Sequence, residues 1–392
     1  MMTGAFQFSG TPKIIFGSGS FDRLPSLLSQ YGHRIILVTG KKSFQQSHHS
    51  KVLLQAPEAQ VADVKIISIP GEPSPEMIDS AVSGLRSFDA EVVVAVGGGS
   101  VIDAGKAVSA MLTVNGNITE FLEDVGSMEH PGTKIPFIAV PTTSGTGSEA
   151  TKNAVISRTG KNGFKKSLRH DNFVPDAALV DPELTTQCPP EITAASGMDC
   201  FSQLTEAYLS TKSNLYTDAL ALEGLKAVRS SLLQCYEKGS DINARAGMSF
   251  ASLTSGICLA NAGLGAVHGF ASSIGGLYDI PHGLICGTLM SVTNELTLRK
   301  LSKTGYGLTA LKKYARLGEL FVGGQDRPEE EKASDFINYL HETTAKLNLT
   351  GLKKSGVRVK DFPEICRNTG MKNNPAKLDE ADLLEILERR LV

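Results

Sequence analysis

Short apolar runs alternate with amphipathic stretches over the first half of the chain. Runs rich in Val, Ile and Ala are typical of strands in a parallel sheet covered on both faces, and apolar residues three or four apart are typical of helices. The predicted strands are residues 34–39, 64–69, 91–96, 135–140 and 177–181, and the clearest helices between them are residues 74–88 and 100–112. This alternation predicts an α/β domain built on a parallel sheet.

The pattern changes after Pro189 and Pro190. From there to the C-terminal residues, apolar positions recur at helical spacing and strand patterns nearly vanish. We therefore predict two domains, an α/β domain over residues 1–186 and an all-helical domain over residues 187–392. The default expectation for such a pair is a ligand cleft between the domains.

The composition is that of an ordinary globular protein, with 41% hydrophobic residues and a net charge of −2. The sequence has neither a Lys/Arg block that would indicate nucleic acid or an anionic membrane as a partner, nor an apolar run long enough to span a bilayer. The first residues lack the order of a signal peptide. The six cysteines are scattered without a CxxC pair, which favours reduced thiols. We expect a cytoplasmic protein with a small-molecule partner.

A glycine-rich loop follows the predicted strand at residues 91–96. Gly97, Gly98 and Gly99 leave room for backbone N–H groups to approach a phosphate, and Ser100 opens a helix whose N-terminus favours negative charge. The alternative is a tight strand–helix turn without a ligand. The segment matches neither the G-x-G-x-x-G fingerprint nor a Walker A loop.

A second loop, "VPTTSGTGSEAT" at residues 140–151, also follows a predicted strand. Its hydroxyl side chains and two glycines suit a ribose or a phosphate. Two such loops at the carboxyl ends of parallel strands predict the crevice in which open α/β sheets bind nucleotides.

Two of the eight histidines, His268 and His282, lie in one stretch rich in small residues. Gly275, Gly276 and Pro281 argue against one continuous helix, so we predict a helix, a tight turn and a second helix. The two imidazoles then either fill a polar core or converge on a ligand.

Five motifs in order resemble the iron-containing (group III) alcohol dehydrogenases. They are "GGGSVID", "PTTSGTGSEAT", "ALVDPELT", "SGMDCFSQLTEAYLS" and "AVHGFASSIGGLYDIPHG", and the resemblance covers nearly the whole chain. It implies a dehydroquinate synthase-like architecture, in which NAD(P) meets a divalent metal between a dinucleotide-binding domain and a helical metal domain. It also implies interconversion of an alcohol and an aldehyde or ketone by a homodimer or a larger homo-oligomer.

The resemblance implies a metal site for Fe(II) or Zn(II) at Asp199, His268 and His282. The family histidine four residues after the aspartate is Gln203 here. Gln203 either ligates through its amide oxygen, or the site uses three protein ligands and water, as catalytic zinc sites do. A third alternative is a degenerate site in a protein that keeps only nucleotide binding.

A further family histidine, to which proton transfer is assigned, is Ser272 here. A serine does not act as a base near neutral pH without an activating neighbour. Ser272 either passes a proton through its hydroxyl group or leaves this role to solvent.

The resemblance also implies the residues that contact the dinucleotide. The loop from Gly97 to Ser100 and Asp103 would hold the pyrophosphate and the nicotinamide side, and Lys165 matches a lysine that reaches toward the cofactor. The ribose would lie against the second loop, at Thr142, Thr143 and Ser144.

Cofactor choice depends on the end of the predicted strand at residues 34–39. Many relatives place an aspartate there, which bonds the ribose hydroxyls and repels a 2′-phosphate. This chain has Gly40 followed by Lys41, Lys42 and Ser43, which favours NADP(H) over NAD(H). The alternative is that the two lysines form a solvated turn.

The sequence thus predicts an NADPH-linked, metal-assisted alcohol dehydrogenase or aldehyde reductase. Two alternatives to this prediction remain, the first a related kind of enzyme and the second a protein of another class. One is a polyol dehydrogenase of the glycerol type or a maleylacetate reductase-like enzyme. The other is a nucleotide-binding protein without catalysis.

Overall fold

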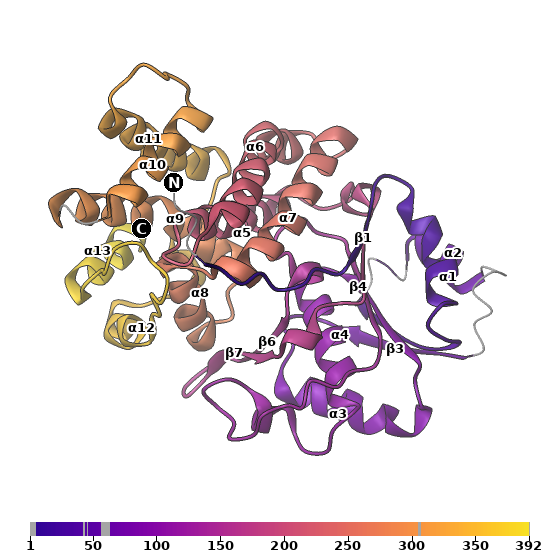
Figure 1. Cartoon of the computed structure of the whole chain (residues 1–392). Helices are drawn as coiled ribbons and strands as arrows, with labels where there is room; N and C mark the ends of the chain where they lie inside the picture. The colour runs from indigo at the N-terminus through magenta and orange to yellow at the C-terminus, as the bar shows by residue number, and fades with distance from the viewer. Residues whose placement is uncertain (1–4, 42–43, 45, 56–62, 305–306, 392) are drawn as a thin grey trace.

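The chain folds into two lobes, one built on a sheet and one helical (Figure 1). The structure is a computed structural model and describes residues 5–41, 44, 46–55, 63–304 and 307–391. Six parallel strands form the main sheet in the order β1-β8-β5-β4-β2-β3, and two antiparallel strands form a hairpin. The sheet strands are β1 (Lys13–Phe16), β2 (Arg34–Gly40), β3 (Asp63–Ile69), β4 (Val92–Gly97), β5 (Phe137–Pro141) and β8 (Ala177–Val180), and the hairpin strands are β6 (Asn153–Arg158) and β7 (Phe164–Arg169).

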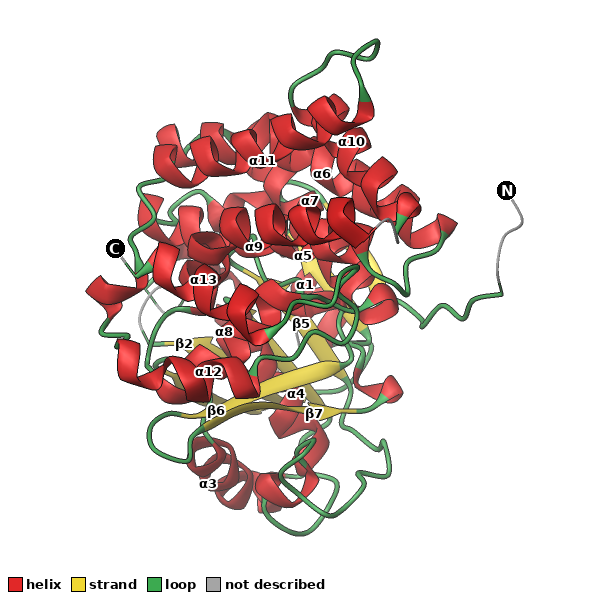
Figure 2. Ribbon diagram, turned by 90° about the vertical axis from the view of Figure 1, so that its left-hand side faces the viewer, coloured by secondary structure: helices red, strands yellow, loops and turns green. Residues whose placement is uncertain are grey.

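Helices cover both faces of the main sheet (Figure 2). This is why its central strand β4 is fully buried from Val92 to Val96 and carries no polar side chain. The helices of this lobe are α1 (Leu24–Leu28), α2 (His48–Gln55), α3 (Pro75–Leu85) and α4 (Gly99–Met111).

The second lobe contains the longest helices of the described chain. Pro190 occupies the first turn of α5, where its missing N–H costs nothing, and the side chains of Asn214 and Asp241 cap the next two helices. The helices are α5 (Pro190–Leu209), α6 (Leu215–Glu237), α7 (Ile242–Ala262), α8 (Ala266–Leu277), α9 (His282–Thr304), α10 (Leu308–Phe321), α11 (Glu329–Lys346), α12 (Phe362–Asn368) and α13 (Glu380–Arg390).

The β6–β7 hairpin joins the two lobes. It follows β5 in the chain, yet its tip packs on α8 of the helical lobe, where the Gly160 N–H donates to the Gly276 carbonyl oxygen at 3.1 Å. A Cβ on Gly276 would lie 3.3 Å from the Phe164 Cα, so the glycine allows this close approach. The predicted helix, tight turn and second helix are confirmed. Gly275 and Gly276 lie in the last turn of α8, which ends at Leu277, and α9 begins at His282 directly after Pro281.

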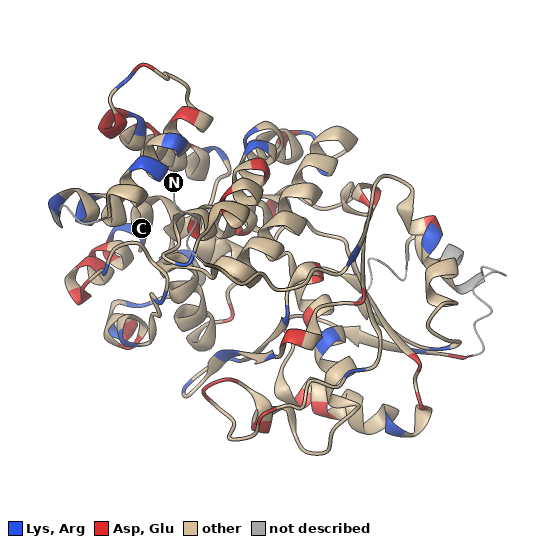
Figure 3. Cartoon of the chain, in the orientation of Figure 1, with Lys and Arg blue, Asp and Glu red and all other residues tan. Residues whose placement is uncertain are grey.

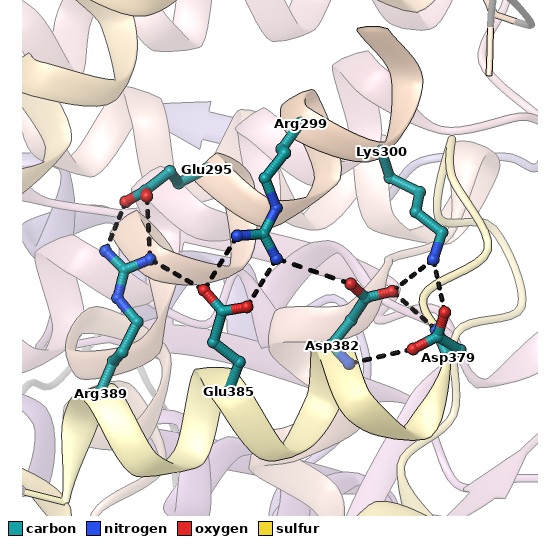
Figure 4. Close-up of polar contacts among 7 residues, drawn as sticks. All are labelled: Glu295, Arg299, Lys300, Asp379, Asp382, Glu385 and Arg389. Atoms are coloured by element: carbon teal, nitrogen blue, oxygen red, sulfur yellow. Dashed lines mark hydrogen bonds and ion pairs between the residues drawn. The ribbon is translucent and has the colours of Figure 1, made fainter. Parts of the chain in front are cut away.

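Ion pairs fasten the C-terminal helix α13 to α9 (Figure 4). Arg299 forms two hydrogen bonds with Glu385, at 3.0 and 2.6 Å, and Arg389 forms two with Glu295, at 2.8 and 2.7 Å. Lys300 also reaches Asp382 at 2.8 Å. Arginine–carboxylate pairs with two hydrogen bonds, when they are joined in one network, contribute more to the stability of the fold than isolated surface ion pairs do. They hold α9, the helix that begins with His282.

Charged side chains of both signs are interspersed over the two lobes (Figure 3). Among the described residues, no single helix is long and apolar enough to cross a membrane. The helices α7 and α8 satisfy that test only when taken together, and they are bent by 96° relative to each other.

Candidate active site

A cavity of about 1250 Å³ lies between the two lobes. Its walls come from the glycine loop before α4, the β6–β7 hairpin, the first half of α5, and the facing parts of α8 and α9. Pockets for drug-sized ligands measure roughly 300–1,000 Å³. The cavity therefore has room for a dinucleotide together with a small substrate.

Four side chains with metal-ligating atoms converge on the helical side of this cavity. They are Asp199 on α5, His268 on α8, and His282 and Cys286 on α9, and one ligand atom from each lies within 4.8 Å of the other three. Gly283 makes the convergence possible, because a Cβ there would lie 2.2 Å from the Ala195 carbonyl oxygen of α5. The start of α9 thus rests directly on α5, and His282 faces Asp199.

The distances within this cluster are short. Asp199 Oδ1 lies 3.1 Å from His268 Nε2 and 3.8 Å from His282 Nε2. Cys286 Sγ lies 3.8 Å from His268 Nε2 and 3.7 Å from His282 Nε2. A carboxylate and two imidazoles form a donor set that suits Fe(II) and Zn(II). The residues present therefore fit the metal that the sequence predicts.

A second layer of polar side chains orients the cluster. Glu206 lies two turns after Asp199 on α5, and its carboxylate is 2.6 Å from His268 Nδ1 and accepts from the Val267 N–H at 2.7 Å. A carboxylate on the far nitrogen of a metal-binding imidazole fixes the ring and its tautomer. Sequence reasoning missed Glu206, although its spacing of seven from Asp199 puts both on one face of a helix.

Gln203 contacts Asp199 through its nitrogen. Its Nε2 donates to Asp199 Oδ1 at 3.3 Å, and its Oε1 accepts from the Ser255 hydroxyl at 3.0 Å. The amide oxygen that the sequence analysis considered as a ligand thus faces α7. In this arrangement Gln203 orients the Asp199 carboxylate.

The electrostatic field of the cluster attracts positive charge. Burial opposes charge on Asp199, but the nearby imidazoles of His282 and His268 lower its pKa to about 2. Burial and the ammonium group of Lys165 lower the pKa of His282 to about 4. Asp199 is therefore an anion and His282 a neutral imidazole near pH 7. Although burial favours neutral His268, its contacts with Cys286, Asp199 and Glu206 raise its pKa, so this ring releases a proton when a metal binds.

The glycine loop on the opposite wall joins β4 to α4. Gly98 has ordinary extended backbone angles, and a Cβ there would meet only the Thr143 side chain, at 3.3 Å from Oγ1. Because Gly98 has no Cβ, its backbone on this wall of the cavity is open to a ligand. The N-terminus of the 13-residue helix α4 points its partial positive charge at the same place.

Lys106 fastens the second loop to α4. It is fully buried, and its ammonium group donates to the carbonyl oxygens of Ser148, Thr151 and Asn153 at 2.8 to 2.9 Å. Burial lowers its pKa to about 8, although Asp103 and other carboxylates nearby favour its charged form. Lys106 thus fixes the position of the second loop relative to helix α4, and both elements contribute to the cavity wall. The sequence analysis missed it, because a lysine in a helix is usually solvent-exposed.

Asp103, Lys165 and Glu72 are ionisable residues that line the cavity on the α/β side. Asp103 Oδ2 accepts from the Val155 N–H at 3.0 Å, whereas its buried Oδ1 has no partner among the described residues. Burial raises the pKa of Asp103 to about 6. Lys165 reaches in from β7 and pairs with Glu72 at 3.0 Å, and Ser100 donates to the same carboxylate at 3.4 Å. Sequence reasoning did not identify Glu72.

The structure brings most of the predicted site residues to this cavity. Those that line it are Gly98, Gly99, Ser100, Asp103, Thr143, Lys165, Asp199, Gln203, His268, Ser272 and His282. Gly97, Thr142 and Ser144 lie behind this wall, where the Thr142 N–H donates to the Gly97 carbonyl oxygen at 2.9 Å. Ser144 is buried against Ser249, with 3.2 Å between the two hydroxyl oxygens.

Gly40 and Lys41 lie at the carboxyl end of β2 and do not line the cavity. The register pairs Thr39 with Val96, so Gly40 is level with Gly97 on the neighbouring strand. Lys41 is exposed. Lys42 and Ser43 lie outside the described residues.

Both halves of the chain match known families. Residues 11–182 match the family described as iron-containing alcohol dehydrogenase, and residues 193–391 match the C-terminal domain of the Fe-containing alcohol dehydrogenase family. The chain is 31% identical to an NADPH-dependent butanol dehydrogenase of Clostridium saccharobutylicum over 398 residues, which cover 97% of each chain.

Solved structures agree with these matches. The chain superimposes on an archaeal halo-thermophilic alcohol dehydrogenase from a Red Sea brine pool with a TM-score of 0.91 at 25% identity, covering 100% of both chains. It superimposes on a sulfoacetaldehyde reductase from Bifidobacterium kashiwanohense, solved in complex with NAD⁺, with a TM-score of 0.85 at 25% identity and 99% of both chains.

Proposed function

Because the chain belongs to the iron-containing alcohol dehydrogenase family, we propose that it reduces a small aldehyde or ketone with NADPH at a divalent metal, and oxidises the alcohol in reverse. The observation that carries this proposal is one cavity with a metal-ligating cluster on one wall and a glycine loop at a helix N-terminus on the other. The two sets of residues suit the two groups that the reaction needs.

Asp199, His268 and His282 would hold the divalent ion, which would supply Lewis-acid stabilisation of charge on the substrate oxygen, and the bound nicotinamide would supply or take up the hydride. The backbone N–H groups at Gly98 and Gly99 bind the pyrophosphate at the start of α4. The buried Oδ1 of Asp103, which has no partner among the described residues, would accept a hydrogen bond from the cofactor.

Ser272 handles the proton in this proposal. It lies one turn after His268 on α8, and its side chain is exposed to the cavity. Its hydroxyl group passes a proton between the substrate oxygen and water, since a serine is too weak a base to hold that proton itself.

Removing the metal is the direct test of this function. The protein is assayed with NADPH and a panel of short aldehydes as purified, after chelation, and after addition of Fe(II) or Zn(II). We expect activity to fall on chelation and to return with metal. Unchanged reduction by the chelated protein would refute the metal mechanism. NADPH binding without turnover of any aldehyde would instead favour a nucleotide-binding protein, and turnover confined to polyols or enones would favour the other enzymes considered above.

We further propose a preference for NADPH over NADH. Gly40 is level with the glycine loop on the adjacent strand, and a carboxylate at the position of Gly40 would repel a 2′-phosphate. Lys41 follows Gly40 and is exposed, so its ammonium group can approach the phosphate oxygens. Replacing Gly40 with aspartate is expected to reverse the order of kcat/KM for the two cofactors. A higher kcat/KM with NADH in the unmodified protein would contradict this prediction.

We also propose that the protein is a homodimer or a larger homo-oligomer in the cytoplasm. Strand β1 lies at an edge of the main sheet and exposes Ile14 and Phe16, each 41% exposed, beside Phe250 of α7. An exposed apolar edge strand invites pairing with another copy. All six cysteines are free, which suits a reducing compartment.

A further inference from the structure

We propose that Cys286 is the fourth protein ligand of the metal and takes the place of the imidazole that the chain lacks at position 203. This inference rests on the metal site of the proposed function and names one more of its ligands. It makes the site a cluster of one carboxylate, two imidazoles and one thiolate.

The spacing of Cys286 from His282 explains why both reach the same point. Because α9 begins at His282, Cys286 follows one helical turn later on the same face. His282 is partly exposed to the cavity, whereas Cys286 is fully buried behind it. The thiol therefore approaches the cluster from the protein interior and leaves the cavity side open for a substrate.

Four distances within the cluster are close to those of a tetrahedral site. Ligand atoms at about 2.0 Å (N or O) and about 2.3 Å (S) from one zinc ion are roughly 3.6 Å apart for an N···S pair and roughly 3.3 Å apart for an N···O pair. The two N···S distances from Cys286 are 3.8 and 3.7 Å, and the two N···O distances from Asp199 are 3.1 and 3.8 Å. All four atoms lie within 4.8 Å of one another, as the ligands of one ion do.

The alternative fourth ligand, Gln203, has other partners. Its Oε1 accepts from the Ser255 hydroxyl, and its Nε2 faces Asp199. Among the described residues, in contrast, the Cys286 thiol forms hydrogen-bond contacts only with the two imidazole nitrogens of the cluster. Glutamine is also a neutral, weakly donating ligand for a first-row transition metal, whereas a thiolate is a strong one.

Cobalt substitution tests the proposal, because a thiolate bound to Co(II) gives an intense charge-transfer absorption in the near ultraviolet that oxygen and nitrogen ligands do not give. The full-length protein is stripped of metal, loaded with Co(II), and compared with Cys286→Ser, Gln203→Ala and Cys258→Ser. Cys258 is the matched control, since it is equally buried and its thiol contacts the Thr217 carbonyl oxygen away from the cluster.

We expect the charge-transfer band in the unmodified protein, in Gln203→Ala and in Cys258→Ser, and its loss in Cys286→Ser. The Zn(II) affinity of Cys286→Ser should fall by at least about 10-fold, since losing even an outer-shell partner of a metal ligand costs about 10–100-fold. The result in the unmodified protein decides the question even if a variant does not fold.

Two results would overturn the proposal. One is Co(II) bound to the unmodified protein without the charge-transfer band, and the other is a band that persists in Cys286→Ser. In both cases metal-dependent aldehyde reduction by the unmodified protein would leave the proposed function intact. Failure of the unmodified protein to bind Co(II) or Zn(II) at all would overturn both.

Discussion

His282→Ala is expected to remove the metal and to lower kcat/KM for aldehyde reduction by ~10³-fold, because Lewis-acid stabilisation supplies several kcal/mol and each 1.36 kcal/mol is tenfold in rate. His282 is a better choice than Asp199 or His268, which form a close buried pair with each other. Removing one member of such a pair leaves an unpaired buried charge and destabilises the fold. Bound metal, measured by elemental analysis, should fall together with the rate.

The control for this substitution is His341→Ala. His341 lies on α11 and contacts Glu295 at 2.9 Å, far along the chain from the cluster. It should keep the metal and the activity of the unmodified protein. If the His282→Ala protein reduces aldehydes as fast as the parent while containing no metal, the cluster has no catalytic role.

Gly98→Val is expected to weaken dinucleotide binding by about 5- to 100-fold, because overpacking costs about 1–3 kcal/mol and each 1.4 kcal/mol is tenfold in affinity. Gly98 is the one glycine of the loop that isolates this effect. A Cβ on Gly97 would lie 2.6 Å from the Val101 side chain and one on Gly99 would lie 2.5 Å from the Thr146 side chain, so those variants would strain the fold as well.

Titration of NADPH fluorescence measures this effect, and thermal unfolding shows whether the fold is preserved. Gly84→Val is the matched control, because a Cβ on this helical glycine of α3 has no atom within 4 Å and α3 does not line the cavity. Equal NADPH affinity of the Gly98→Val protein and its parent would show that the loop is a turn and not a phosphate site.

The sequence predicts the sheet and the family because both depend on local signals. The buried strands β2, β4, β5 and β8 carry nearly continuous apolar runs, and the predicted dehydroquinate synthase-like fold and alcohol dehydrogenase family are confirmed. The weaker run of β3 also predicts a strand, although Ile69 is its only buried residue. The other strands lack that signal. β1 has only four residues, three of them exposed, and β7 reads "FKKSLR", in which polar residues occupy both faces. Whether such a segment forms a strand depends on the elements that pack against it, and its own residue pattern does not show this.

The site was less predictable than the fold, for a physical reason. Asp199, His268 and His282 follow from the family motifs, but Glu206, Lys106 and other buried charges have no pattern that separates them from surface residues. The spacing of Cys286 from His282 is visible in the sequence. Its meaning depends on where α9 begins, and that position is set by packing of Gly283 against α5.

The β6–β7 hairpin and α8 connect the two lobes through a contact between backbones. A Cβ on Gly163 would lie 2.1 Å from the Gly276 carbonyl oxygen, so the hairpin and α8 touch through their backbones. Lys165 lies on this hairpin, and His268 lies two turns before the contact on α8. Any side chain at Gly163 would therefore push the hairpin away from α8 and move Lys165 relative to His268, although neither of these residues would itself be changed.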